Sequence, residues 1–243
     1  MNLQVLTYNV FGMPWGLASI EAVLLWVFYK TGAEILCLQE VFSQDHKTRI
    51  QELCEQDNSQ WNCWFPEVEP TCLSRWTSYF DSPSGLCILT KKEITILSEP
   101  YFEPFEQVAS VDRFVRKGFL HLSCEKDNQK FNVLTVHFQS DFTECRYRIQ
   151  YQDIRIQQEI QLYRYVKDLQ NAIVVGDFNT SRFYHFTFVN EKRECTFRET
   201  GESLDHCLIL QPKSIQSERT VYFHKMKLSD HTPVLFCLRF LKP

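Results

Sequence analysis

Short apolar segments rich in β-branched and aromatic residues recur along the chain and are separated by polar stretches. Runs of this length and composition are typical of β-strands. We predict strands at residues 3–10, 35–41, 85–90, 118–124, 131–138, 172–176, 204–210, 220–223 and 233–240. The strands at 118–124 and 131–138 are joined by a short polar loop, which favours an antiparallel pair.

Three segments instead carry apolar residues at helical spacing. The first covers residues 20–29, with a core face formed by Ile20, Val23, Leu24 and Val27. Ser43 can cap a second helix, whose apolar face comprises Ile50, Leu53 and Cys54. The third runs from about 147 to 169, with a stripe of Ile149, Ile156, Ile160, Tyr163 and Val166. Many strands with few helices predict an α+β fold, a four-layer α/β sandwich of two packed, mostly antiparallel β-sheets flanked by helices.

The first helix is unusually apolar, because Leu25, Trp26, Phe28 and Tyr29 extend its hydrophobic surface beyond the core face. Two interpretations remain open: a helix packed on two sides, or an aromatic surface that contacts a membrane or a partner. The apolar run is far shorter than the ~20 residues that span a bilayer. No linker divides the 243 residues, so we expect a single domain over 1–243.

The net charge of -4 and the absence of a Lys/Arg-rich run argue against a protein that grips long duplexes. Short nucleic acids, nucleotides and phospholipid head groups remain possible partners. The 10 cysteines include no Cys-x-x-Cys pair, and Cys37, Cys87, Cys207 and Cys237 lie in apolar strands. Because the first strand begins at Leu3, we also expect no signal peptide, and therefore reduced thiols and a cytoplasmic protein. We further expect a monomer.

The polar residues that carry chemistry follow the apolar strands. Carboxylate, amide or imidazole side chains stand at or near the strand ends, at Asn9, Glu40, His137, Asp177, Asn179, Asp205, Asp230 and His231. Each could be an ordinary turn or solvated strand end if taken alone. Strand ends on one rim of a sheet converge, so together these residues predict one site.

The motifs that contain these residues resemble the endonuclease/exonuclease/phosphatase superfamily, which includes DNase I, abasic-site endonucleases, inositol polyphosphate 5-phosphatases and neutral sphingomyelinases. The matching segments are Thr-Tyr-Asn-Val (7–10), Leu-Gln-Glu-Val (38–41), Thr-Val-His (135–137), Gly-Asp-Phe-Asn (176–179), Ser-Leu-Asp-His (203–206) and Ser-Asp-His-Thr-Pro-Val (229–234). They fall in the family's order over nearly the whole chain. The resemblance implies a hydrolase that cleaves phosphodiesters with a divalent metal.

Phosphodiester hydrolysis needs a metal to neutralise charge, an activated water and donors around the phosphoryl oxygens. Hard oxygen ligands select Mg²⁺ or Mn²⁺. Glu40 and Asn9 are the expected metal ligands, which the resemblance also implies, with Asp230 assisting.

Asp177 would orient or deprotonate the attacking water, and Asn179 would bond to the phosphate or the water. His231 would contact the scissile phosphate with Asp205 orienting its imidazole, and His137 would supply a second donor. We expect His206 to point to the opposite face of its strand, away from the site.

Two departures from the family pattern concern binding groups. Phe11 stands where abasic-site endonucleases carry an acidic residue, so a second metal ligand from that strand is absent. The nuclease branches of the family also often carry an Arg or Tyr between the second and third motifs, and several residues of this chain could fill that place. Those candidates are Arg113, Arg116, Lys117 and Tyr101, although a charge cluster of this kind is usually a solvated face. We predict that Arg113, Arg116 and Lys117 bind the substrate, together with Trp76 of the aromatic loop at 71–83.

The substrate stays open between classes. Segments 84–86, 116–119, 155–158 and 210–214, and Gly-Met-Pro at 12–14, resemble sphingomyelinases, and an aromatic loop at 71–83 could contact a membrane. Leu-Gln-Glu at 38–40 is common in nucleases. We therefore favour a sphingomyelin-like phospholipid, with a nuclease or DNA-end phosphodiesterase as the alternative. An inositol phosphate phosphatase and a non-catalytic binding module are the remaining hypotheses.

Overall fold

The structure is a computed structural model of the chain. It describes residues 1–11, 19–56, 59–67, 84–144, 147–149, 151–186, 195–197, 199–210, 215–221 and 229–241, with only the backbone at 142–144, 147–149, 217 and 219.

One of the two large sheets contains the N-terminal strand. Its strand order is β13 (Ile215–Val221), β14 (Val234–Phe240), β1 (Asn2–Asn9), β2 (Ile35–Gln39), β4 (Cys87–Lys91) and β3 (Trp61–Trp64). Among these strands only β1 and β2 run parallel; the other neighbours are antiparallel.

The second large sheet has a similar arrangement. Its order is β12 (Asp205–Ile209), β11 (Ala172–Asp177), β8 (Gln129–His137), β7 (Gly118–Lys126) and β5 (Thr95–Ile96), with β6 (Tyr101–Pro104) also paired to β7. Of its described pairs, β8 with β11 is the parallel one. A separate two-stranded sheet consists of β9 (Phe142–Glu144) and β10 (Tyr147–Ile149).

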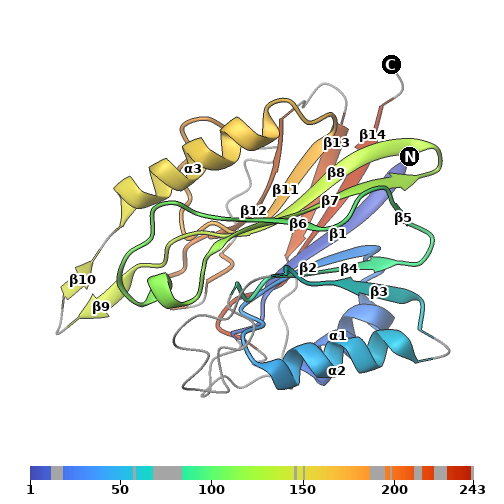
Figure 1. Cartoon of the computed structure of the whole chain (residues 1–243), viewed down its shortest axis with the longest axis horizontal. Coiled ribbons are helices and arrows are strands. Elements are labelled where there is room, and N and C mark those ends of the chain that lie inside the picture. Colours follow the sequence, from blue (N-terminus) through green and yellow to red (C-terminus); the bar gives the residue numbers. More distant parts are fainter. Residues whose placement is uncertain are drawn as a thin grey trace.

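The helices cover the outer faces of the two sheets, which makes four layers (Figure 1). Helices α1 (Ile20–Lys30) and α2 (Gln44–Glu55) lie on the β1–β2 sheet, and α3 (Gln152–Val166) lies on the other sheet. A short 3₁₀ helix, η2 (Ser110–Phe114), precedes β7. Three apolar layers fill the spaces between sheet and sheet and between each sheet and its helices. The predicted α+β sandwich is confirmed.

The helix caps and core faces follow the sequence pattern in the first two helices. The Ser43 side chain accepts a hydrogen bond from the His46 backbone and caps α2. On α1, Trp26 and Phe28 pack partly against the core, whereas Tyr29 is 77% exposed. Of the four additional apolar residues, Trp26 and Phe28 are therefore packed, whereas Leu25 and Tyr29 are exposed to solvent. Contact of this surface with a membrane or a partner stays a prediction.

The predicted third helix was wrong at its start and in its buried face. Residues 147–149 form β10, and α3 begins only at Gln152. Its buried residues are Arg155, Gln158, Glu159, Leu162 and Val166, of which the predicted stripe contained only the last. The polar residues are buried because they bond to backbone groups: Glu159, for example, accepts from the N–H groups of Tyr184 and His185. A hydrophobic stripe cannot reveal such a face.

Several short strands were not predicted, namely β3, β5, β6, β9 and β10. The strand predicted at 220–223 is the end of a longer strand, since β13 begins at Ile215; residues 222–223 lie outside the described part. No helix in the described ranges is both long and apolar enough to cross a membrane.

Candidate active site

The two parallel strand pairs end at one edge of the sandwich. Asn9 ends β1 and Glu40 follows β2, while His137 ends β8 and Asp177 ends β11. The carboxyl ends of parallel strands are a common place for ligand sites, because side chains from neighbouring strands converge there. The two sheets thus each contribute two polar residues to the same edge.

Asp205 and His231 reach this edge from strand starts, which corrects the view of all these residues as strand ends. Asp205 begins β12, and it pairs with Asp177 because β12 runs antiparallel to β11. His231 precedes β14, which is antiparallel to β1. An antiparallel neighbour presents its first residue where the parallel strands present their last.

Asn9 joins the two sheets across the edge. Its Nδ2 donates to Glu40 Oε1 at 2.9 Å and to Asp177 Oδ2 at 3.0 Å, and its Oδ1 accepts from the Phe11 N–H at 2.9 Å. Asn9, Asp177 and His137 are almost fully buried. Glu40 is less buried and adopts a left-handed backbone conformation with φ of 63°, an unfavourable region for residues other than glycine.

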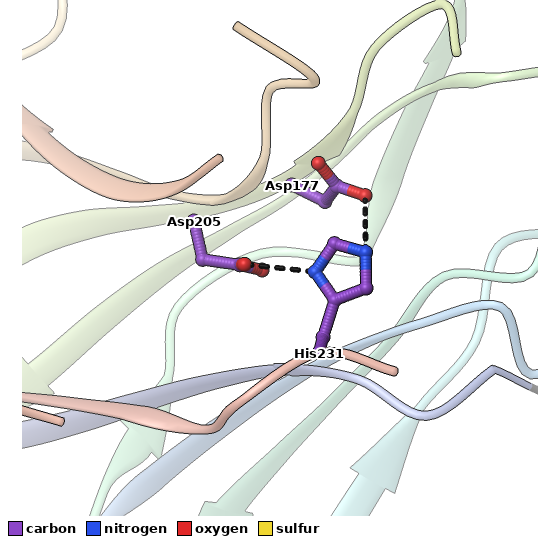
Figure 2. Close-up of side chains that lie close together, drawn as sticks. All are labelled: Asp177, Asp205 and His231. Atoms are coloured by element: carbon purple, nitrogen blue, oxygen red, sulfur yellow. Dashed lines mark hydrogen bonds and ion pairs between the residues drawn. The ribbon is translucent and has the colours of Figure 1, made fainter. Parts of the chain in front are cut away.

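His231 lies between two carboxylates (Figure 2). Its Nδ1 is 2.8 Å from Asp205 Oδ2, and its Nε2 is 3.6 Å from Asp177 Oδ2. Burial alone would lower the pKa of His231, but the charges of Asp205 and Asp177 outweigh it and raise the pKa to about 10. The imidazole is therefore a cation at neutral pH.

His137 has the opposite electrostatic character. Its Nε2 lies 3.5 Å from Asp177 Oδ2 and 3.9 Å from Glu40 Oε1, and neither ring nitrogen has a hydrogen-bond partner among the described residues. Burial, with the charges of Lys117 and His231, lowers its pKa well below the ordinary value of 6.5. A neutral, buried imidazole without partners is suited to contact a bound group.

The donor set fits a divalent cation. Burial raises the pKa of Glu40 to about 7 and also raises the pKa of Asp177, so a positive ion between these carboxylates would relieve an unfavourable concentration of negative charge. Ligand atoms of Asp177, Asp205 and His231 also lie within 4.8 Å of one another, close enough to hold a metal ion. Both arrangements use atoms that are already hydrogen-bonded, since Asp205 pairs with His231, and Asn9 pairs with Glu40 and the Phe11 N–H. Glu40 and Asn9 as the metal ligands therefore stay a prediction.

Asn179 and Asp230 border the site. The Asn179 N–H donates to Asp177 Oδ1 at 2.8 Å, and its Nδ2 donates to the Phe138 carbonyl at 3.1 Å. Asp230 accepts from Ser229 Oγ at 3.2 Å, and its negative charge contributes to the raised pKa of both Glu40 and His231. Asn179 therefore fixes the Asp177 carboxylate, and Asp230 lies close enough to act on the centre electrostatically.

The predicted substrate-binding residues have different surroundings. Lys117 is buried, forms an ion pair with Asp112 Oδ2 at 2.9 Å and donates to the Phe138 carbonyl at 2.8 Å. Arg113 is exposed and donates to the Val108 carbonyl, and Arg116 is half-buried. Trp76, with the whole loop at 71–83 and segments 12–14 and 211–214, lies outside the described residues. Their substrate-binding role stays a prediction.

Asp112 was not predicted from the sequence, yet its carboxylate pairs with Lys117 and accepts from the Ser140 N–H at 2.8 Å. It lies in η2, where no periodic pattern marks a buried residue. His206 is outside the site as predicted: its Nε2 is 3.0 Å from the Thr180 carbonyl, and its ring packs against Phe178 and Phe183.

A comparison with known proteins identifies the family of the chain. The model of the Endonuclease/Exonuclease/phosphatase family matches residues 6–231, which include every residue placed at the site. Members of this family are typically hydrolases that act on phosphodiester bonds. No curated protein sequence matches the chain at a significant level.

Solved structures share the fold at low sequence identity. Sphingomyelinase C from Streptomyces griseocarneus has a TM-score of 0.68 and 17% identity, with 98% of this chain and 99% of that chain covered. D. rerio TDP2 complexed with single-strand DNA product has a TM-score of 0.71 and 14% identity, with the same coverage. A mutant of beta toxin from Staphylococcus aureus with bound magnesium ions has a TM-score of 0.66 and 15% identity, covering 97% and 99%.

Proposed function

The chain belongs to the endonuclease/exonuclease/phosphatase family, and from that membership we propose that it is a Mg²⁺- or Mn²⁺-dependent phosphodiesterase. One observation carries the proposal: the His231 imidazole lies between Asp205 and Asp177, next to the Asn9–Glu40 pair. This supports a site in which a cation, a carboxylate that could activate water and oxygen atoms that could bind a metal lie at one edge of the sandwich.

Asp177 is the group that activates water. Asn179 and Asn9 donate to its two carboxylate oxygens, which fixes the direction in which the carboxylate points. Burial raises its pKa, which makes it a stronger base than an exposed aspartate. The attacking water would give its proton to Asp177 as its oxygen bonds to phosphorus and the ester bond to the leaving oxygen breaks.

The two histidines supply donors to the phosphoryl oxygens. The imidazolium of His231, held by Asp205, would stabilise the charge that grows on these oxygens in the transition state. His137 is neutral and would donate one N–H. A divalent cation held by Glu40 and Asn9, with Asp230 nearby, would neutralise further negative charge on the phosphate.

We propose a sphingomyelin-like phospholipid as the substrate. The solved structures with this fold include sphingomyelinase C, and two apolar side chains are exposed on η2. On η2, Val111 is 53% and Phe114 is 42% exposed, and η2 is tied to the segment after His137 by the Asp112–Ser140 hydrogen bond. Of the cations in this region, Lys117 is buried and paired with Asp112, whereas Arg113 on η2 is exposed.

The experiment is phosphocholine release from sphingomyelin in mixed micelles with Mg²⁺. We expect turnover by the wild-type chain and none by Asp177→Asn or His231→Gln. The double variant Val111→Ser/Phe114→Ser should lose lipid turnover while its turnover of soluble bis-p-nitrophenyl phosphate changes much less. Leu97→Ser, an exposed residue on the loop after β5, is the matched control.

A nuclease or DNA-end phosphodiesterase is the second candidate, favoured by the similarity to TDP2 in complex with DNA. Hydrolysis of single-stranded, abasic or end-blocked oligonucleotides without any lipid turnover would establish it in place of the lipid enzyme. No turnover across that panel would remove it.

A further inference from the structure

The interface between the two sheets changes from apolar to polar toward the active-site edge. Because successive side chains on a strand point to opposite faces, every second residue faces the other sheet. On β1 the inward residues are Leu3, Val5, Thr7 and Asn9, and on β8 they are Phe131, Val133, Thr135 and His137. The change occurs at Thr7 and Thr135, one layer before the catalytic residues.

Gln39 connects the sheets in this layer. Its Nε2 donates to Thr135 Oγ1 of the opposite sheet at 2.8 Å and to Thr7 Oγ1 of its own sheet at 3.1 Å. The Thr7 hydroxyl in turn lies 3.3 Å from Gln39 Oε1. All three side chains have an exposed fraction of 0%. A hydrogen bond in such surroundings is well shielded from water, and its loss leaves a buried polar group unpaired.

The same three residues adjoin the site in sequence. Thr7 is two residues before Asn9, Thr135 is two before His137, and Gln39 directly precedes Glu40. The Gln39 carbonyl also accepts from the Val10 N–H at 3.1 Å, so both the side chain and the backbone of Gln39 are anchored. The next residue, Glu40, has a φ of 63°, and a fixed preceding residue helps to hold it in that conformation.

We propose that Gln39 is a positioning residue that sets the separation between the two halves of the active site through its bond to Thr135. One half consists of Asn9 and Glu40 at the edge of the β1–β2 sheet. The other half consists of His137 and Asp177 at the edge of the sheet that contains β8 and β11. The inference rests on the proposed function, since it assigns a role within that site. It adds a residue for which the strand-end pattern gave no task.

The alternative is that the Gln39 bridge only stabilises the fold, and a set of variants separates the two roles. Gln39→Met keeps the length of the side chain but removes its polar atoms, and Thr135→Val removes the partner hydroxyl. The double variant tests whether the two act through their shared bond. Ile173→Val is the matched control, because Ile173 is equally buried between the sheets on β11 but lies farther from the edge.

We would measure kcat and KM for bis-p-nitrophenyl phosphate with Mg²⁺, and Mn²⁺ affinity by calorimetry, at a temperature well below the melting temperature of every variant. Crystal structures of the variants would show the geometry of the site. We expect Gln39→Met and Thr135→Val each to lower kcat or Mn²⁺ affinity about 10- to 100-fold, as loss of a supporting hydrogen bond does at metal sites. KM should change little. The double variant should lose no more kcat or Mn²⁺ affinity than the more strongly affected single variant. In the crystal structures of the variants, the Asn9–Asp177 hydrogen bond should be longer than in the wild type.

The inference is overturned if Gln39→Met matches Ile173→Val in kcat and Mn²⁺ affinity and keeps the Asn9–Asp177 distance. If the wild-type chain hydrolyses no ester, the proposed function fails instead. In that case Mn²⁺ affinity and the crystal structures still decide whether Gln39 positions the two halves.

Discussion

Replacing Asp205 by Asn should make the activity fall steeply at alkaline pH. Asp205 Oδ2 lies 2.8 Å from His231 Nδ1, and its charge is the largest influence that raises the pKa of His231 against the effect of burial. The substitution keeps the shape of the side chain but removes that charge. The pKa of His231 should then fall from about 10 toward its ordinary value of 6.5.

The size of the effect follows from this fall. The rise of the pKa from 6.5 to about 10 corresponds to about 5 kcal/mol in favour of the imidazolium, at 1.36 kcal/mol for each pKa unit. If the pKa returned to 6.5, about one His231 in a hundred would stay protonated at pH 8.5, against most of them at pH 6. The fold-reduction in activity relative to the wild type should thus be up to about 100 times larger at pH 8.5 than at pH 6.

The assay is Mg²⁺-dependent hydrolysis of bis-p-nitrophenyl phosphate by wild type and Asp205→Asn between pH 5.5 and 9.5, with the His231 ring titrated by NMR. Glu159→Gln is the control, since it removes another buried carboxylate, one that binds the backbone N–H groups of Tyr184 and His185 and not the His231 ring. An equal loss of activity at pH 6 and pH 8.5 would refute the reasoning, because the charge of His231 would then not matter.

Three further predictions concern metal affinity, stability and strand packing. Because the pKa of Glu40 is raised to about 7 by burial, Mg²⁺ affinity should weaken as pH falls below 7, and calorimetry should find it strongly reduced in Glu40→Gln at every pH. His137→Leu should abolish turnover. It should nevertheless raise the free energy of unfolding in urea by about 1 kcal/mol, since it removes buried nitrogens that have no hydrogen-bond partner among the described residues. A large fall in the free energy of unfolding would contradict this. Gly176→Ala should lower the melting temperature far more than Gly201→Ala. A Cβ atom at position 176 would lie 2.1 Å from the Val136 carbonyl oxygen, whereas a Cβ atom at position 201 would have no other atom within 4 Å.

The sequence predicted the layers and the polar edge because both depend on local periodicity. Apolar segments with period two become strands wherever they bury one or both faces, and the residues after them converge at an edge. Asn9, Glu40, His137 and Asp177 could be found in this way. The same pattern included Asp205 and His231, although they lie before strands rather than after them.

The remainder depends on contacts between distant segments. The polar face of α3 is buried because Arg155, Gln158 and Glu159 bond to other segments, such as Gln139 and the backbone near residue 185. The role of Gln39 depends on Thr135, 96 positions away in sequence. An alternating pattern places both residues inside the sandwich, but it cannot show that they meet.

The central claim is that a divalent metal and Asp177 together activate water against a phosphodiester. Its most direct test is the steady-state hydrolysis of bis-p-nitrophenyl phosphate by the wild-type chain and by Asp177→Asn, with Mg²⁺ and after chelation by EDTA. We predict turnover only for the wild type with Mg²⁺, restored when Mg²⁺ is added back after EDTA. Turnover that survives EDTA, or that is equal in Asp177→Asn, would contradict the claim.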